Sequence, residues 1–273
     1  MSFPVPRSLS PSKVSAFRSC PLAFRYSVID KIPEASSPAM VKGTLVHRAL
    51  ERLFWQHDQG QRSEAAALSE LDVAWEEIQT DDEFRSLELS EDDLTAFLDD
   101  AAALVSRYFE LEDPDAARAI GVELLMEADI DGMMLRGIID RLDVDDAGDL
   151  VVVDYKTGRA PSEMQENGRM GAVHTYALLC ERVLGIRPAR VKLLYLRDRV
   201  VIEAASSDQS SRGTGIRTNA VWTAICRACQ TEDFRPNPSA LCKGCSFRQF
   251  CPAVGGDPTL VSVAASAAQV ATI

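Results

Sequence analysis

The feature that most constrains the fold is a short apolar run at residues 150–155, LVVVDY, which is followed directly by Lys156. A run of this kind is typical of a central β-strand that is buried on both faces. Just before it, residues 122–130 and 133–144 have strand character and are joined by Asp131-Gly132, a strong signal for a two-residue hairpin turn. The sequence therefore predicts a sheet that needs helices on both of its faces.

Helical patterns surround these strands. Ser10 and Pro11 have the character of a helix N-cap and first helical position, and this helix is expected to continue to about Tyr26. The other predicted elements are helices at 41–55, 64–78, 90–110, 162–184 and 218–230, strands at 191–196 and 200–204, and a polar linker at 206–211. Together they predict an α/β fold, a central mixed β-sheet flanked by helices. We expect one domain over residues 1–257 and a loose C-terminal tail over 258–273.

The charge of the chain is unevenly distributed. The 273 residues carry a net charge of −12, which by itself disfavours binding to a phosphate backbone. Residues 64–115, however, contain 18 acidic and two basic side chains, so the rest of the chain carries about +4. A nucleic-acid role for that remainder is therefore not excluded. The acidic helical insert at 64–115 is either a solvated helical face or a surface that repels DNA and confines it to the opposite face.

Cysteine usage and hydropathy indicate the compartment. The first 19 residues lack the continuous apolar core of a secretion signal, and no run of 18 apolar residues occurs. We therefore expect a cytoplasmic protein without a membrane span. Seven cysteines in such a chain favour metal binding over disulfide formation, because the cytoplasm keeps thiols reduced.

Two carboxylates and a lysine follow the predicted strands. Alternation along a strand puts Asp154 and Lys156 on the same face, and the hairpin allows Asp140 to lie beside them. Two carboxylates at one point repel each other unless a cation joins them, and hard oxygen ligands suit Mg²⁺ or Mn²⁺. A neighbouring lysine can orient or deprotonate water and stabilise charge on a phosphate. These groups suit the hydrolysis of a phosphodiester, although Asp154 and Lys156 alone could be an ordinary ion pair.

His47 is a candidate third element of this site. It lies on the apolar-striped helix at 41–55, four residues after Gly43, which allows close approach of another segment. The alternative is a packed or surface histidine without a catalytic role.

The C-terminal cysteines form a second constellation. Cys242, Cys245 and Cys251 are spaced as metal ligands, and a fourth ligand is needed. Cys20 is one candidate. The alternative is a four-cysteine zinc site in which the pair Cys226 and Cys229 joins Cys242 and Cys245, although these two residues are also typical of small side chains buried in a helix. Four thiolates suit Zn²⁺ or an iron–sulfur cluster equally well.

Taken together, these residues resemble the RecB-type branch of the PD-(D/E)XK nuclease superfamily, which includes Cas4-like and AddB-like nucleases. The resemblance covers roughly residues 9–252 and rests on motifs that occur in the family's order. They are Ser10-Pro11-Ser12 through Cys20-Pro21, Gly43-Thr44-x-x-His47, Gly137-Ile138-Ile139-Asp140-Arg141, Asp154-Tyr155-Lys156-Thr157-Gly158, and the cysteines 242, 245 and 251.

The resemblance implies a restriction-endonuclease-like fold and a metal-dependent DNA exonuclease of repair or recombination. It implies that His47, Asp140, Asp154 and the Tyr155 carbonyl hold Mg²⁺ or Mn²⁺, and that Lys156 is the catalytic lysine. It also implies a [4Fe–4S] cluster held by Cys20 together with the cysteine segment 236–252, that is by Cys242, Cys245 and Cys251; Zn²⁺ is the alternative.

One departure concerns the helix after the lysine strand, where the family carries Gln-x-x-x-Tyr. Here Tyr176 is present, but Ala172 stands four residues before it, and Gln165 lies too far away to replace the glutamine. A catalytically weak or inactive nucleic-acid-binding or assembly module is therefore one alternative, and a zinc-ribbon interaction protein is another. The chain lacks a nucleotide-binding P-loop, since Gly213-Thr214-Gly215 has no following lysine. Any unwinding of DNA ends would need a separate helicase.

Overall fold

The computed structural model describes residues 2–161 and 163–262, with the side chains of 163–173 left out. The chain divides into two compact units. The terminal unit comprises Met1–Ala35, Glu127–Arg136 and Arg212–Ile273, and the sheet unit comprises Ser36–Met126 and Gly137–Ser211.

The order of elements matches an α/β fold. The helices are α1 (Pro11–Ser19), α2 (Pro21–Phe24), α3 (Pro38–Gln56), α4 (Glu64–Ile78), α5 (Asp82–Arg85), α6 (Glu91–Tyr108), α7 (Glu163–Leu184) and α8 (Asp208–Thr231). The strands are β1 (Ala119–Ile130), β2 (Met133–Val144), β3 (Leu150–Lys156), β4 (Arg190–Tyr195) and β5 (Val200–Ala205). A π-helical turn, Arg25–Ile29, follows α2, and 3-10 turns lie at Ala240–Gly244, Arg248–Phe250, Pro252–Val254 and Pro258–Leu260.

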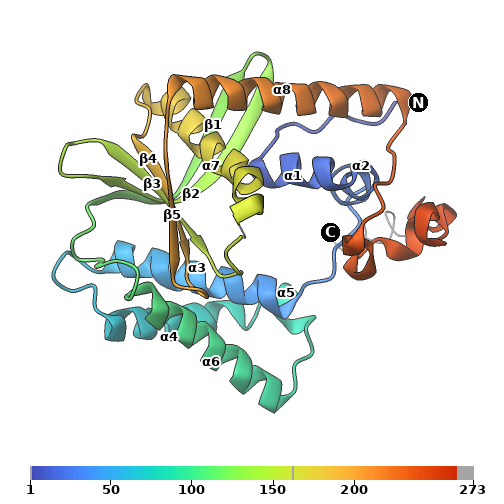
Figure 1. Cartoon of the computed structure of the whole chain (residues 1–273). Helices are drawn as coiled ribbons and strands as arrows, with labels where there is room; N and C mark the ends of the chain where they lie inside the picture. Colours follow the sequence, from blue (N-terminus) through green and yellow to red (C-terminus); the bar gives the residue numbers. More distant parts are fainter. Residues whose placement is uncertain (1, 162, 263–273) are drawn as a thin grey trace. The chain divides into compact units, whose positions relative to one another are not determined.

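The strands form one mixed sheet in the order β1-β2-β3-β4-β5 (Figure 1). β3 pairs antiparallel with β2 and parallel with β4, and β4 pairs antiparallel with β5. The central position of β3 and the burial of Leu150–Tyr155 confirm the prediction from its apolar run. The hairpin turn is also confirmed, because Asp131 and Gly132 have φ angles of 54° and 84°, as a type I′ turn requires.

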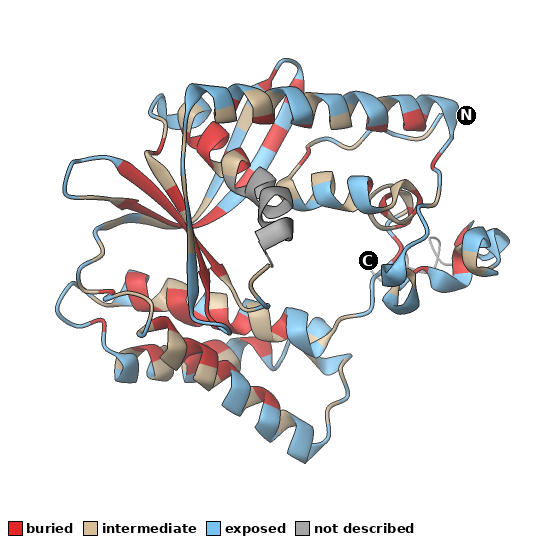
Figure 2. Cartoon of the chain, viewed as in Figure 1, coloured by how far each residue is buried: buried red, intermediate tan, exposed pale blue. Residues whose placement is uncertain are grey.

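Helices α3, α4 and α6 pack together against the sheet (Figure 1). Their apolar stripes meet the odd-numbered residues of β3, and this layer forms a core of buried residues in the sheet unit (Figure 2). Buried residues of the acidic segment include Leu71, Phe97 and Leu104. The acidic segment 64–115 is therefore built into the core through one face of each long helix, while its acidic side chains are mostly at the surface.

The N-terminal helix differs from the prediction of one helix reaching Tyr26. Ser10 caps α1, as predicted, by accepting a hydrogen bond from the Lys13 N–H at 3.2 Å. The helix then stops at Cys20, which is extended with φ −160° and ψ 106°. Pro21 is the physical reason, because a proline disfavours the helical conformation of the residue before it.

The predicted polar linker at 206–211 is wrong for residues 208–211, which begin α8. The start of this helix is held by the Ser210 N–H donating to the Ser207 hydroxyl and the Ser207 N–H donating to the Ser210 hydroxyl. The serines therefore cap a helix instead of forming a loop. Of the predicted tail, Pro258–Leu260 forms a 3-10 turn, and residues 263–273 lie outside the described part of the chain. Within the described ranges, none of the helices has the length and apolar character needed to cross a bilayer.

Candidate active site

Asp140 and Asp154 lie side by side where the β2–β3 ladder ends. The last paired residues are Arg141 and Val153, and continuing that register by one residue brings Asp140 opposite Asp154. There the Tyr155 N–H donates a hydrogen bond to Asp140 Oδ2 at 2.7 Å. Both carboxylates are buried, with Asp154 only 2% exposed. The structure thus brings together the two acidic residues that the strand pattern placed near each other.

Lys156 forms an ion pair with Asp154 on the same side of β3. Burial raises the pKa of Asp154 to about 6, although the Lys156 ammonium opposes this rise. Burial would lower the pKa of Lys156, but Asp154 and Asp140 outweigh it and raise that pKa above its ordinary value. In the metal-free protein Lys156 is therefore a cation, and it can act through its positive charge and N–H donors.

His47 of α3 reaches the same point. Its Nδ1 lies 3.4 Å from Asp140 Oδ2, and its ring packs edge-on against Tyr155 with centroids 6.0 Å apart. Burial lowers the pKa of His47, but the hydrogen bond and charge of Asp140 more than offset that effect and raise it. Gly43 allows α3 to approach this end of β3, because a Cβ there would lie 3.2 Å from the Thr157 hydroxyl.

Glu123 of β1 is a site residue that the sequence reasoning missed. Ligand atoms of Glu123, His47 and Asp140 all lie within 4.8 Å of one another. Burial and the negative charge of Asp140 raise the pKa of Glu123 to about 7. Its φ of 46° is left-handed, which is rare for a residue with a side chain and often accompanies functional sites.

The hairpin held a signal for Glu123. Counting back from the two-residue turn at 131–132 pairs residue 123 with residue 140. The same count pairs Val144 with residue 119. The Val144 N–H, however, donates to Arg118 O at 3.0 Å, so the pairing has shifted by one residue. An extra residue is therefore taken up in β1 between these points, as in a β-bulge, and bulges often re-aim a side chain beside an active site.

These groups suit a divalent metal ion. Among the described residues, His47, Glu123 and Asp140 gather within ligand reach of a common point, and Asp154 lies beside Asp140. Carboxylate oxygens with one imidazole suit Mg²⁺ or Mn²⁺. Metal binding would also offset the repulsion among three neighbouring carboxylates. The Tyr155 carbonyl as a further ligand stays a prediction.

Tyr176 of α7 lies against the acidic pair. Burial, followed by the charge of nearby Asp154, raises its pKa well above the ordinary value. Gly137 makes room for the ring, because a Cβ there would lie 3.2 Å from Tyr176 Cε1. Ala172 and Gln165 lie in the segment whose side chains are outside the described part of the structure.

Exposed arginines lie in the loops that follow β3 and β4. Register brings Lys156 opposite Tyr195, and the Ala160 N–H donates to Asp198 Oδ2 at 2.6 Å, which ties the two loops together. Arg159 and Arg197 are carried by these loops and are exposed. They offer positive charge near the lysine end of the sheet.

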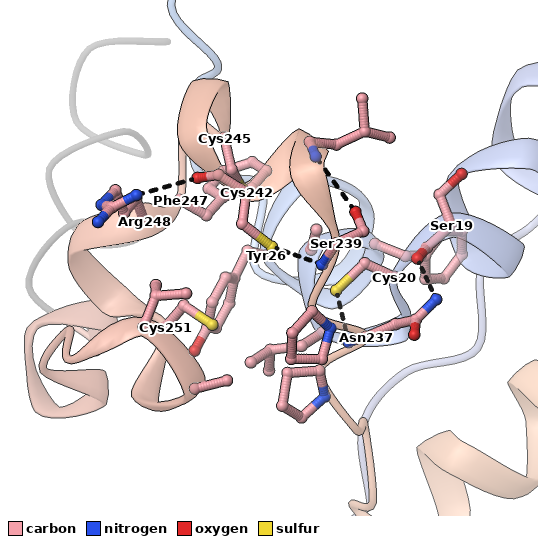
Figure 3. Close-up of a pocket in the computed structure, with 18 of the residues that line it drawn as sticks. Ser19, Cys20, Tyr26, Asn237, Ser239, Cys242, Cys245, Phe247, Arg248 and Cys251 are labelled. Carbon is pink, nitrogen blue, oxygen red and sulfur yellow. Dashed lines mark hydrogen bonds between the residues drawn. The ribbon is translucent and has the colours of Figure 1, made fainter.

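The four cysteines predicted as cluster ligands lie in the terminal unit and line one cavity of about 250 Å³ (Figure 3). The Asn237 N–H donates to Cys20 Sγ at 3.4 Å, and the Ser239 N–H donates to Cys242 Sγ at 3.3 Å. The cavity is closed on one side by aromatic residues, among them Tyr26 and Phe247.

The sulfurs are more widely spaced than a single zinc ion requires. Zn–S bonds of about 2.3 Å bring tetrahedral sulfurs to within about 4 Å of one another. Among the described residues, no three cysteine sulfurs lie within 4.8 Å of each other. Cys226 and Cys229 lie on α8 and do not line the cavity; Cys229 is buried and its thiol donates to Pro4 O at 3.7 Å.

Comparison with known proteins gives a family match. A sequence model of the PD-(D/E)XK nuclease superfamily matches residues 8–252. A crystal structure of the protein SSO0001 is 16% identical, with a TM-score of 0.43, covering 90% of this chain and 86% of that one. A crystal structure of a candidate exonuclease from Eubacterium rectale is 11% identical, with a TM-score of 0.49 and coverages of 88% and 87%. No curated protein matches the chain by sequence.

Proposed function

The chain belongs to the PD-(D/E)XK nuclease superfamily, and from this premise we propose that it is a metal-dependent exonuclease that hydrolyses phosphodiester bonds of DNA. The observation that carries the proposal is the meeting of Asp140, Asp154 and Lys156 on neighbouring strands, with His47 and Glu123 at the same point. The proposed substrate is DNA ends or single-stranded DNA, and the proposed process is DNA repair or recombination. Any unwinding of duplex DNA is proposed to come from a separate helicase.

In this mechanism His47, Glu123, Asp140 and Asp154 would hold the divalent ion. When bound, the ion supplies positive charge that stabilises the negative charge developing on the phosphate. The Lys156 ammonium orients the attacking water and adds a second positive charge beside the same phosphate. Asp154 holds Lys156 in place, and the Tyr176 hydroxyl in turn orients Asp154.

The test is a cleavage assay with labelled single-stranded DNA, duplex DNA and RNA in Mg²⁺, Mn²⁺ or EDTA. Lys156→Ala should lower the cleavage rate by about 10²-fold or more, since it removes a charge that acts on the transition state. Lys31→Ala is the matched control, because Lys31 is an exposed lysine of the terminal unit. Degradation from DNA ends alone would support the exonuclease.

Two results would refute this function. One is wild-type protein that cuts none of these substrates in either metal. The other is Lys156→Ala protein that cuts as fast as the wild type, which would favour a binding or assembly module over a nuclease.

We propose further that Cys20, Cys242, Cys245 and Cys251 hold a [4Fe–4S] cluster that joins the N-terminal helices to the C-terminal turns of the terminal unit. Support comes from the shared cavity and from N–H donors to two of the sulfurs. The proposed role is structural, because the cluster would join segments far apart in the sequence.

Metal analysis of anaerobically purified protein tests the cluster. We expect iron and sulfide, a brown colour, and loss of both with Cys20→Ser. Cys226→Ser is the matched control and should keep the iron, since Cys226 lies on α8 outside the cavity. One zinc ion without iron, kept in Cys20→Ser and lost in Cys226→Ser, would instead support the zinc-ribbon alternative.

A further inference from the structure

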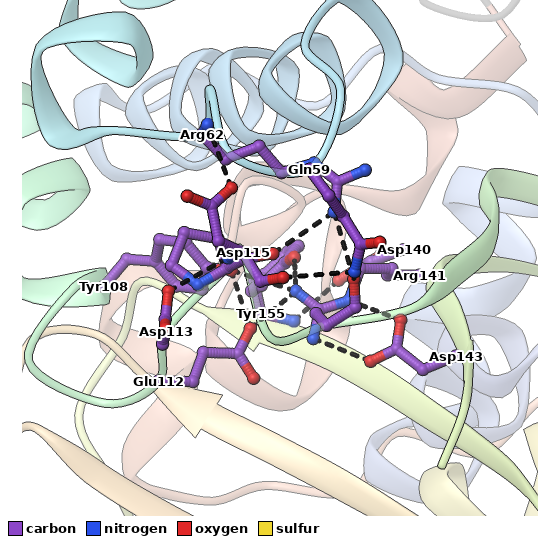
Figure 4. Close-up of polar contacts among 12 residues, drawn as sticks. Gln59, Arg62, Tyr108, Glu112, Asp113, Asp115, Asp140, Arg141, Asp143 and Tyr155 are labelled. Atoms are coloured by element: carbon purple, nitrogen blue, oxygen red, sulfur yellow. Dashed lines mark hydrogen bonds and ion pairs between the residues drawn. The ribbon is translucent and has the colours of Figure 1, made fainter. Parts of the chain in front are cut away.

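A fully buried arginine lies directly behind the candidate active site in the sheet unit. The side chain of Arg141 is 1% exposed and is held by partners on every side (Figure 4). It forms a two-pronged ion pair with Asp143 at 2.8 and 2.9 Å and contacts Glu112 Oε1 at 2.5 Å. It also donates to the hydroxyls of Tyr108 at 3.0 Å and Tyr155 at 2.7 Å. We call Arg141 with these four partners the arginine brace.

The brace lies where the backbone stops holding the two acidic strands together. Paired residues of β2 and β3 end at Arg141 and Val153, although β3 continues to Lys156. Beyond that point, the described contacts between the two strands include two hydrogen bonds made by Tyr155. Its N–H donates to the Asp140 carboxylate, and its hydroxyl accepts from Arg141 Nη1. Beside the active site, hydrogen bonds to side chains therefore join the two strands where backbone pairing has ended.

Tyr155 connects the brace to the acidic residues. Strand alternation turns its side chain away from Asp154 and Lys156, toward Arg141, while its peptide N–H faces Asp140. A shift of the phenol ring would move the backbone that carries this N–H. The position of the Asp140 carboxylate therefore depends on how firmly the Tyr155 side chain is held.

The acidic segment supplies two of the four partners of Arg141. Tyr108 is the last residue of α6, and Glu112 follows it by one turn and accepts a hydrogen bond from the Tyr108 hydroxyl at 2.7 Å. Burial would raise the pKa of Glu112, but Arg141 more than offsets this and lowers it. Glu112 is thus ionised at neutral pH, and the segment 64–115 reaches the back of the site through a part-buried charge pair.

We propose that Arg141 is a positioning residue of the active site, and that Glu112 and Tyr108 of the acidic segment hold it so that Tyr155 fixes the Asp140 carboxylate beside Asp154. This inference rests on the proposed function, because it assigns the brace to the proposed metal site. The acidic segment then has a part in setting the geometry of the site, in addition to its solvated or DNA-repelling surface.

The experiment uses the full-length protein with Glu112→Gln and with Tyr155→Phe. The first keeps the shape of the side chain and removes its charge, and the second removes one hydroxyl. Leu71→Ala is the control, because Leu71 is buried in α4 of the same helical layer and has no polar contact with the brace. The readouts are amide hydrogen exchange of residue 155 in metal-free protein and the Kd for Mn²⁺ by calorimetry.

We expect the amide of residue 155 to exchange up to about tenfold faster in both brace variants, which is the equivalent of one weakened hydrogen bond. We also expect the Kd for Mn²⁺ to rise about tenfold, as for loss of a group that orients metal ligands. Leu71→Ala should lower the melting temperature and leave both quantities unchanged.

The positioning role would be overturned if both variants exchanged the amide of residue 155 at the wild-type rate and bound Mn²⁺ with the wild-type Kd. Equal changes in Leu71→Ala would also overturn it, since they would reflect stability alone. If the wild type binds no Mn²⁺ or cuts no DNA, the proposed function fails, and exchange at residue 155 still decides whether the brace holds Asp140.

Discussion

Replacing Glu123 by glutamine should stabilise the metal-free protein at alkaline pH and weaken its response to metal. Glu123 carries a carboxylate next to Asp140, and burial and that neighbouring charge raise its pKa from an ordinary 4.5 to about 7. The folded protein therefore resists the ionisation of Glu123, and it does so most strongly when no cation is present. Glutamine keeps the shape of the side chain and removes the charge.

The size and sign of the effect follow from this pKa. A rise from 4.5 to about 7 corresponds to about 3 kcal/mol in a site that excludes water. Glu123 is partly exposed, so we expect about 1–2 kcal/mol after screening by solvent. Because the folded-state pKa is the higher one, the penalty is absent below about pH 4.5, grows between pH 4.5 and 7, and is complete above pH 7.

The assay is thermal unfolding of wild type and Glu123→Gln in EDTA at pH 5 and pH 8, repeated with Mn²⁺. At pH 8 in EDTA the variant should melt about 2–6 °C higher, and at pH 5 the two should nearly coincide. Mn²⁺ should raise the melting temperature of the wild type more than that of the variant, since the variant lacks a ligand. Glu127→Gln is the control, because Glu127 is an exposed residue of the same strand.

A Glu123→Gln variant that is less stable than wild type at pH 8 in EDTA would refute the reasoning. So would a stability difference that is the same at both pH values, because the effect would then not come from ionisation. An equal Mn²⁺ response in the two proteins would remove Glu123 from the metal site.

Two further predictions test the surroundings of the site. Replacing Arg159 and Arg197 together by alanine should weaken DNA binding by a similar factor for all DNA sequences. Measured by fluorescence anisotropy, the slope of log K against log salt concentration should fall by about 2. An unchanged slope would show that neither arginine contacts the DNA. Gly137→Ala should lower the free energy of unfolding by about 1–3 kcal/mol and lower the cleavage rate. The reason is that its Cβ would lie 2.8 Å from Leu179 and 3.2 Å from Tyr176. A variant with the wild-type cleavage rate would show that Tyr176 need not stay in place.

Local chemistry made much of the fold predictable. The apolar run at 150–155 could only be a strand buried on both faces, and Asp131-Gly132 could form the left-handed pair that a tight hairpin needs. The prediction was wrong where two local rules competed. Pro21 interrupts the N-terminal helix through its effect on Cys20, and the serines at 206–211 cap a helix although they have the composition of a loop.

The acidic site was only partly predictable for a different reason. Asp154 and Lys156 are two residues apart on one strand, so alternation alone placed them together. Glu123 could be found only by counting back across the hairpin, which pairs residue 123 with residue 140. The sequence gives no clear sign of the extra residue in β1, nor of the left-handed backbone at Glu123. The contacts that join Arg141 to the acidic segment are between residues 29 or 33 positions apart, which periodicity cannot detect.

The charge of residues 64–115 acquires a more specific meaning from these contacts. Counted by sequence, its acids form one negative surface, yet Glu112 is half-buried and paired with Arg141, while Asp99 is exposed on α6. A charge on Glu112 acts over hydrogen-bond distances on the strand that carries Asp140. A charge on Asp99 would act on the proposed DNA substrate only through an electric field that salt screens. Glu112→Gln should therefore change metal affinity at any salt concentration, and Asp99→Asn should change at most DNA affinity at low salt. Deleting the whole segment would not separate these effects, because α4 and α6 also form the core against α3 and β3.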